Sequence, residues 1–270
     1  MISGSAIAPI QPNGSKRPLF AIHVLGRGLN FYRPLASHLG PDQPVYGLAA
    51  QMSNQLDAPA NEVKALATHY IQQMQTVQPQ GPYHLAGLSF GGTIAFEMAQ
   101  QLQVQGQEVA LLALLDTFAP STGVRKSPLH SRFAAYFKRL SEMTLTQALN
   151  KLREEWLEQT LKYPALAEVY QWVYRRCDRP FPEAFQDILY ARQNLDASSV
   201  YVPEIYPGRI VLMRARDQRI SIKFDADPRS GWSEVAAGGV KVHEIPGDHT
   251  GMLQEPNVRV LAKAFQLYLD

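Results

Sequence analysis

The chain has little of several features that mark particular protein classes. It contains one cysteine, Cys177, so no internal disulfide can form and a reducing compartment suits it. Lysine and arginine number 26 against 24 acidic residues, a formal net charge of +2, and no basic run is long enough to indicate nucleic-acid binding. No apolar run approaches membrane-spanning length, and no signal peptide is evident after Met1. We therefore expect a cytoplasmic protein that binds neither nucleic acid nor membrane.

The composition suits a single enzyme-sized domain. The chain has 270 residues, and 46% of them are hydrophobic, as in globular proteins. A chain of this length buries a sizeable core without a second domain. We predict no metal site and no bound cofactor.

A glycine-rich sequence, GLSFGG over residues 87–92, follows an apolar run at residues 82–86. It matches the G-x-S-x-G nucleophile elbow, in which a serine sits on a strained turn between a strand and a helix. Glycine at 87 and 91 removes Cβ atoms that would otherwise clash in such a turn. Apolar residues at helical spacing follow the motif until Gly106. The pattern predicts that Ser89 is a nucleophile and that the next helix directs its N-terminus at the site.

Strand-like and helical patterns alternate on both sides of a central segment. Residues 109–115 are apolar throughout, which is typical of a strand buried on both faces of a parallel sheet. With the elbow, this predicts the α/β hydrolase fold, a mostly parallel sheet with helices on both faces. We place its core at residues 18–120 and 208–270. Residues 121–207 have helical patterns and are interpreted as a lid insertion, and residues 1–17 as a linker or terminal segment rich in Ser, Gly, Pro and Asn.

The elbow requires an acid and then a histidine, in the chain order Ser, Asp or Glu, His. Asp116 comes directly after the buried run at residues 109–115, and catalytic groups collect at the carboxyl ends of such strands. Asp217 is a rival, because it follows a later strand-like run and many hydrolases of this fold keep the acid there. It also stands between Arg216 and Arg219, where a surface ion pair would explain it. We favour Asp116.

The histidine is chosen by its position in the chain. His249 lies in a glycine-containing loop over residues 246–252, between a strand-like run at 240–245 and the final helical pattern. His84 and His243 fall inside predicted strands and are expected to be packed or edge residues. The seven histidines of the chain are His23, His38, His69, His84, His130, His243 and His249.

These residues suggest a serine acyl-transfer mechanism. His249 would take the Ser89 proton and later return one to the leaving group, while Asp116 would orient the imidazole. The oxyanion would be held by the backbone N–H of Phe90 and by one from the loop after an early strand. In that loop, residues 24–28, the second N–H would come from Val24 or Leu25.

Motifs along nearly the whole chain, apart from its centre, resemble thioesterase domains of non-ribosomal peptide and polyketide synthases. The similar sequences are RPLF at 17–20, HVLG at 23–26, FYRPLA at 31–36, PVYGL at 44–48, GPYHLAG at 81–87, LDT at 115–117, GWS at 231–233 and PGDH at 246–249.

The resemblance implies release of an acyl or peptidyl chain from the phosphopantetheine thioester of a carrier protein, which would be the partner. It also implies that Asp116 is the acid and that Val24 gives the second oxyanion N–H. Leu25 and Arg27 become candidate substrate-binding residues. Arg27 departs from the usual Gly, Asn or Tyr, and a solvated loop cation is the simpler interpretation of it.

The sequence leaves other functions open. A carboxylesterase or lipase would use the same three residues, and a hydrolase fold can also serve as a binding module. The complete set of Ser89, Asp116 and His249 disfavours a pure binding module. Within the thioesterase interpretation, hydrolysis and macrocyclisation need the same residues, as do terminal release and editing of misloaded carriers.

Overall fold

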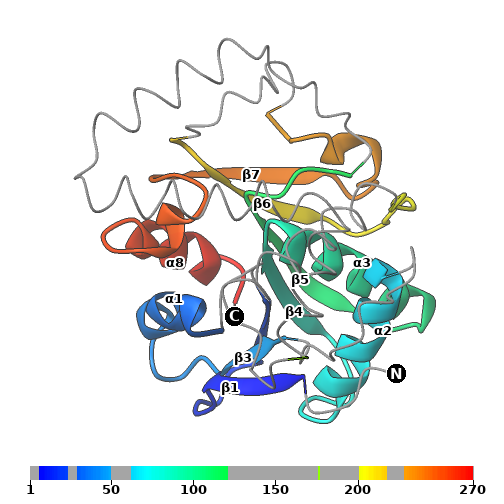
Figure 1. Ribbon diagram of the computed structural model, residues 1–270, viewed down its shortest axis with the longest axis horizontal. Helices are drawn as coiled ribbons and strands as arrows, with labels where there is room; N and C mark the ends of the chain where they lie inside the picture. Colours follow the sequence, from blue (N-terminus) through cyan, green and yellow to red (C-terminus); the bar gives the residue numbers. More distant parts are fainter. Residues whose placement is uncertain are drawn as a thin grey trace. The chain divides into compact units, whose positions relative to one another are not determined.

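The computed structural model describes residues 6–23, 29–49, 62–120, 176, 201–217 and 228–269. The chain divides into two compact units, and all the named helices and strands belong to the first, Met1–Gly123, Asn194–Ile220 and Phe224–Asp270. This unit contains a seven-stranded sheet in the order β1-β3-β2-β4-β5-β6-β7 (Figure 1). The strands are β1 (Ile7–Gln11), β2 (Leu19–Ile22), β3 (Val45–Leu48), β4 (Tyr83–Leu88), β5 (Val109–Leu115), β6 (Ile210–Ala215) and β7 (Val240–Ile245).

The sheet is parallel except at one edge. Strand β1 pairs with β3 antiparallel, and every other neighbouring pair is parallel. The described helices are η1 (Leu29–Tyr32), α1 (Arg33–Leu39), α2 (Glu62–Gln75), α3 (Phe90–Val104), η2 (Trp232–Glu234), η3 (Gly251–Leu253) and α8 (Val258–Gln266).

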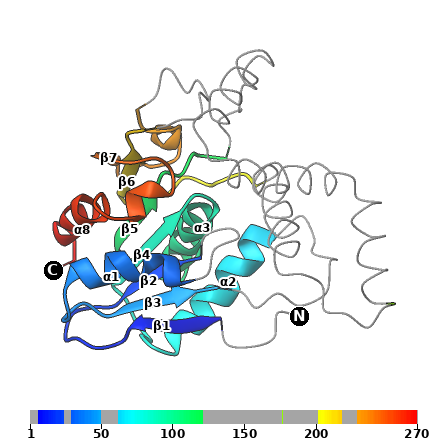
Figure 2. The same cartoon turned by 60° about the vertical axis from the view of Figure 1, so that its left-hand side comes forward.

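Helices cover both faces of the sheet. Helices α2 and α3 lie side by side on one face, and α1 and α8 lie side by side on the other (Figures 1 and 2). Alternate strand residues supply the two cores, as the two-residue period of a strand requires. On β5, Leu112 and Leu114 face α2 and α3, whereas Ala113 and Leu115 face α1 and α8. The predicted α/β hydrolase fold, with a mostly parallel sheet between two helical layers, is confirmed.

The prediction of a linker over residues 1–17 is wrong for Ile7–Gln11. These residues form β1 and pair with β3 from Ile7 opposite Leu48 to Gln11 opposite Val45. Pro9 is tolerated because β1 is an edge strand, where a missing backbone N–H costs no ladder bond on the open side. Composition hid this strand, since serine, glycine and proline surround a short apolar stretch.

Most of the predicted lid insertion, residues 121–200 apart from Arg176, lies outside the described residues, so the lid stays a prediction. The end of that range, residues 201–207, is described and packs on the core. Tyr201 and Tyr206 are buried, and the Tyr206 ring lies 5.9 Å from that of Phe96 on α3.

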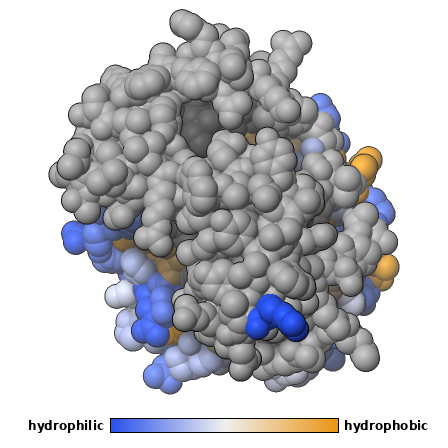
Figure 3. Space-filling model, in the orientation of Figure 1, coloured by the Kyte–Doolittle hydropathy of each residue, from blue (hydrophilic) through white to orange (hydrophobic). Residues whose placement is uncertain are grey.

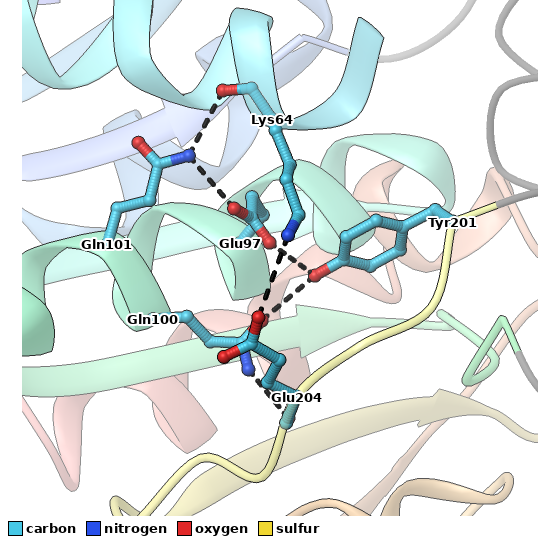
Figure 4. Close-up of polar contacts among 6 residues, drawn as sticks. All are labelled: Lys64, Glu97, Gln100, Gln101, Tyr201 and Glu204. Atoms are coloured by element: carbon cyan, nitrogen blue, oxygen red, sulfur yellow. Dashed lines mark hydrogen bonds and ion pairs between the residues drawn. The ribbon is translucent and has the colours of Figure 1, made fainter. Parts of the chain in front are cut away.

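A polar network fastens this segment to α3 (Figure 4). The buried Glu97 carboxylate accepts a hydrogen bond from the Tyr201 hydroxyl at 2.6 Å and another from Gln101 Nε2 at 2.9 Å. Gln100 Nε2 donates to the carbonyl oxygen of Glu204 at 2.6 Å. The Lys64 ammonium on α2 lies 3.6 Å from the Glu204 carboxylate. The chain that leads into β6 is therefore held by one buried hydrogen bond, from Tyr201 to Glu97, and by exposed contacts at Glu204, as well as by packing.

On the face shown in Figure 3, the described residues form no broad apolar patch. They are mainly hydrophilic, with small separate hydrophobic areas. Searched over the described residues, no helix has the length and apolar character to cross a membrane, and no three His, Cys, Asp or Glu side chains gather around a possible metal position.

Candidate active site

Ser89 stands on a tight turn between β4 and α3. Its backbone has φ 56° and ψ −124°, a conformation sparsely populated by residues with a Cβ. The Ser89 N–H donates to the carbonyl oxygen of Leu115 at 3.0 Å, which ties the turn to the end of β5. A Cβ at Gly87 would collide with the backbone of Gly91, and one at Gly91 with the carbonyl oxygen of His23. The predicted need for glycine at both positions is confirmed.

Asp116 is the residue directly after β5. Its backbone N–H donates to Met213 O at 2.8 Å, and its side chain is 4% exposed. Carboxylate Oδ1 accepts from the Ala215 N–H at 3.1 Å, and Oδ2 lies 2.7 Å from His249 Nδ1. Backbone contacts with β6 therefore fix the carboxylate, and the carboxylate in turn fixes the imidazole.

His249 follows β7 in the loop that leads to η3, as predicted. Its side chain is 42% exposed, so one edge of the ring faces outward while Nδ1 meets Asp116. A carboxylate oxygen accepts hydrogen bonds, so Nδ1 carries the proton and donates it to Asp116. In the neutral ring, Nε2 then has a free lone pair and can act as a base.

Asp217, the rival acid, makes a different contact. It is exposed, and its Oδ2 accepts from the Gly247 N–H at 3.1 Å, while its own N–H donates to Gly247 O at 3.0 Å. Gly247 has φ 95°, so the loop turns sharply two residues before His249. Asp217 thus holds the base of the histidine loop, and the carboxylate on His249 is that of Asp116.

Two further residues at this edge of the sheet have contacts that no local sequence pattern indicates. The Thr117 hydroxyl lies 3.0 Å from Leu115 O and 3.2 Å from Ser89 O, and so joins the end of β5 to the elbow. The indole N–H of the buried Trp232 donates to Thr117 O at 2.8 Å. Thr117 and Trp232 belong to the sequence motifs LDT and GWS, but only the fold shows which groups they contact.

Backbone strain gives an independent sign of a functional region. Among the described residues, the non-glycine residues with positive φ are Ser89 at 56°, Asp116 at 41° and Ser230 at 54°. The carbonyl oxygen of Ser230 accepts from the N–H of Ala119, close after β5. Such conformations gather at active sites, where the surrounding structure holds them in place. The strained residues thus gather around the carboxyl ends of β4 and β5.

The candidate oxyanion donors are only partly described. Phe90 is the first residue of α3 and is buried, and the helix itself offers no acceptor for its backbone N–H. Val24, Leu25 and Arg27 lie outside the described residues. The close approach of Gly91 to His23 O places the start of α3 against the end of β2, from which the loop at residues 24–28 departs.

Comparison with known proteins identifies the group to which this fold and site belong. The model of the thioesterase domain family matches residues 17–267. The chain belongs to the thioesterase domain family. This thioesterase domain is 44% identical over 272 residues to the dimodular nonribosomal peptide synthase of Bacillus subtilis (strain 168), covering 98% of the chain and 11% of the synthase. It is 30% identical over 288 residues to the chondramide synthase cmdD of Chondromyces crocatus, covering 98% of the chain and 7% of the synthase.

Solved structures agree with this assignment. The thioesterase domain is similar to holo-AB3403, a four-domain nonribosomal peptide synthetase, with a TM-score of 0.66 and 25% identity over 98% of the chain and 20% of that protein. The NocB thioesterase domain has the same fold, with a TM-score of 0.69 and 22% identity over 98% of the chain and all of that domain. The chain spans about a tenth or less of the length of the two synthases named above.

Proposed function

We propose that the chain releases an acyl or peptidyl chain from a carrier-protein phosphopantetheine thioester through a covalent intermediate on Ser89. The 2.7 Å contact between Asp116 and His249, at the sheet edge that also carries the strained Ser89 elbow, is the observation on which the proposal rests. Membership of the thioesterase domain family supplies the substrate class. The similarity to multidomain synthases supports a carrier protein as the partner.

In the first half-reaction, Ser89 Oγ attacks the thioester carbonyl carbon while His249 Nε2 takes its proton. The carbon–sulfur bond then breaks, and the protonated imidazole returns the proton to the departing pantetheine sulfur. Asp116 holds the Nδ1–H tautomer and stabilises the positive charge that the ring carries between these two transfers. The acyl group is left as an ester on Ser89.

In the second half-reaction, His249 takes a proton from the attacking group, which adds to the ester carbonyl. The bond to Ser89 Oγ then breaks, and the imidazole returns the proton to that oxygen. If the attacker is water, the product is a carboxylic acid. If it is an amine or hydroxyl of the acyl chain, the product is a ring, and the three protein groups act in the same way. A lid over residues 121–207 that excludes water would favour ring closure.

Negative charge develops on the carbonyl oxygen in both half-reactions. We assign the backbone N–H groups of Phe90 and Val24 to this oxyanion, with the N-terminus of α3 adding a favourable dipole. Leu25 and Arg27, in the loop that carries Val24, are the candidate contacts for the acyl chain.

Intact-protein mass spectrometry after mixing with a panel of acyl-pantetheine thioesters tests the proposal. Wild-type protein should gain an acyl adduct and form free acid or cyclic product, whereas Ser89→Ala should do neither. A panel of simple esters, run in parallel, distinguishes a thioesterase from a carboxylesterase. Faster turnover of the esters, or a folded wild-type protein that forms no adduct with either panel, would contradict the proposal.

The choice of acid has its own test. Asp116→Asn should lower turnover by ~10⁴, because the amide donates rather than accepts a hydrogen bond at His249 and favours the wrong tautomer. Asp217→Asn is the matched control, since its amide oxygen can still accept from the Gly247 N–H. Steady-state rates should leave Asp217→Asn close to wild type. The reverse ranking of the two variants would make Asp217 the acid.

A further inference from the structure

The buried hydroxyl of Tyr32 connects the strand before the predicted oxyanion loop to the strand before the nucleophile. Tyr32 is the last residue of η1, and its side chain is fully buried. The hydroxyl donates to the carbonyl oxygen of Ile22 at 2.8 Å and accepts from the backbone N–H of Leu88 at 3.1 Å. Ile22 is the last residue of β2, and Leu88 is the last residue of β4.

These two strand ends are neighbours that lead to different parts of the site. The parallel pairing of β2 with β4 runs from Leu19 opposite His84 to Ile22 opposite Gly87. Beyond the last pair, β2 continues through His23 to residues 24–28, and β4 continues into the Ser89 turn. The Tyr32 hydroxyl joins the two strands at their carboxyl ends.

The Tyr32 hydroxyl is suited to hold the spacing between the two strand ends because it serves as donor to one and acceptor from the other. Burial raises the pKa of Tyr32, so the group stays neutral and can donate and accept at the same time. No hydroxyl remains in phenylalanine, so a Tyr32→Phe variant would keep the ring packing but leave the Ile22 carbonyl and the Leu88 N–H without this partner. Buried backbone groups without partners favour a small shift of the chain that brings them to another one.

We propose that Tyr32 is a positioning residue that fixes the spacing between the end of β2 at Ile22 and the nucleophile turn that follows Leu88. This inference rests on the proposed function. In the proposed reaction, Ser89 Oγ attacks the carbonyl carbon and the oxyanion N–H groups bind the oxygen of the same carbonyl. A shift of the Ser89 turn by a fraction of an ångström relative to the end of β2 weakens transition-state stabilisation more than it weakens substrate binding.

Tyr32→Phe tests the inference, with Tyr83→Phe as the matched control. Tyr83 is also fully buried, begins the same strand β4, and donates its hydroxyl to Gln78 O at 3.2 Å, at the end of the strand opposite Leu88. Steady-state rates with an acyl-pantetheine thioester are measured well below both unfolding transitions. Sucrose, which strengthens burial, is added if Tyr32→Phe needs it to fold.

The expected result is a fall in kcat of about ten- to a hundredfold for Tyr32→Phe with KM close to wild type, and near wild-type values for Tyr83→Phe. Equal kcat for the two variants, or a change confined to KM, would overturn the positioning role. The rate of Ser89 labelling by a small fluorophosphonate is measured on the same samples. If the wild type labels but turns over no thioester, the proposed function fails, whereas the comparison of labelling rates still decides the role of Tyr32.

Discussion

Ser89 holds a backbone conformation that any residue with a Cβ disfavours, and the strain is a property of its position rather than of its hydroxyl. Glycine adopts φ 56° and ψ −124° without steric strain, whereas serine and alanine are strained there by their Cβ atoms. The turn is kept by the fixed groups around it, including the Leu115 carbonyl that accepts from Ser89 N. Stability therefore favours glycine at position 89, whereas the proposed reaction requires serine.

Two variants that lack the Ser89 hydroxyl measure this difference in stability. Ser89→Gly should unfold at higher denaturant concentration than Ser89→Ala, with a free energy of unfolding greater by about 1 kcal/mol. The strain relieved is about 1–3 kcal/mol, and the extra flexibility of unfolded glycine offsets about 0.5–1 kcal/mol of it. Equilibrium urea unfolding of both proteins checks the order. A less stable Ser89→Gly would show that the turn is not strained.

Whether a residue of the candidate site can be predicted from the sequence depends on how far along the chain its partners lie. Ser89, Asp116 and His249 can be picked from the sequence, because a local motif, a strand end and the chain order each leave a trace. The contact of Tyr32 with Leu88 joins residues 56 positions apart, and that of Trp232 with Thr117 spans 115. Nothing in the local sequence around Tyr32 or Trp232 indicates these partners, so only the fold could reveal them.

At the scale of elements, the segment 201–206 depends on a buried carboxylate. Glu97 lies within α3, and Tyr201 donates to it across the space between the helix and the returning chain. Burial, and after it the hydrogen bond to Glu97, raises the pKa of Tyr201, so the hydroxyl stays protonated as a donor. Removal of the Tyr201 hydroxyl would leave an oxygen of the buried Glu97 carboxylate without this hydrogen bond, and an unpaired buried polar atom lowers the stability of the fold.

Tyr201→Phe should lower the free energy of unfolding by about 1–3 kcal/mol, because the buried Glu97 oxygen loses its closest donor. Tyr206→Phe is the control on the same segment, since its ring packs beside Phe96 and phenylalanine keeps that packing. Thermal unfolding followed by circular dichroism compares the two proteins. A control that loses as much stability as Tyr201→Phe would show that the loss does not depend on the hydrogen bond to Glu97.

The elements themselves were predictable to different degrees. Strands β5 and β7 occupy the predicted residues, and α3 ends before Gly106 as expected, because long apolar runs and a helix-ending glycine are strong local signals. Strand β1 was missed because an edge strand buries little and leaves a weak pattern. The final helix ends at Gln266, so Tyr268 lies beyond it, and its hydroxyl is 2.7 Å from His243 Nε2.

At the scale of the whole molecule, a buried histidine links stability to pH. His84 lies inside β4, as predicted for a packed residue, and its Nδ1 has no hydrogen-bond partner among the described residues. Burial, with the nearby Arg17 charge, lowers the pKa of His84 from 6.5 to about 4. The folded protein therefore holds this ring neutral where the unfolded chain would already protonate it.

The sign of the effect follows from proton binding. Above about pH 6.5 neither state binds the proton, and the folded state keeps its full stability. As the pH falls from 6.5 to about 4, the unfolded state gains the proton first, and the free energy of unfolding decreases by about 3 kcal/mol from this group.

His84→Gln should remove most of that decrease, because the amide does not titrate and can still donate to the Arg17 carbonyl. Urea unfolding at several pH values between 4 and 7 gives the slopes for the wild type and the variant. His243→Gln, in which a half-buried ring on β7 is replaced, should change the slope less. Parallel curves for wild type and His84→Gln would place the acid sensitivity elsewhere.

The long connection from Leu115 to Ile210 joins two strands that are direct neighbours in the sheet. Ser89 and Asp116 precede the predicted insertion and His249 follows it, so the insertion contains none of the three residues proposed for the reaction. Genetic exchange of residues 121–200 between related domains would leave the strands of the sheet and these three residues unchanged. If the proposed function holds, selection can then act on the choice of acyl chain and on the chemistry as two separately inherited traits.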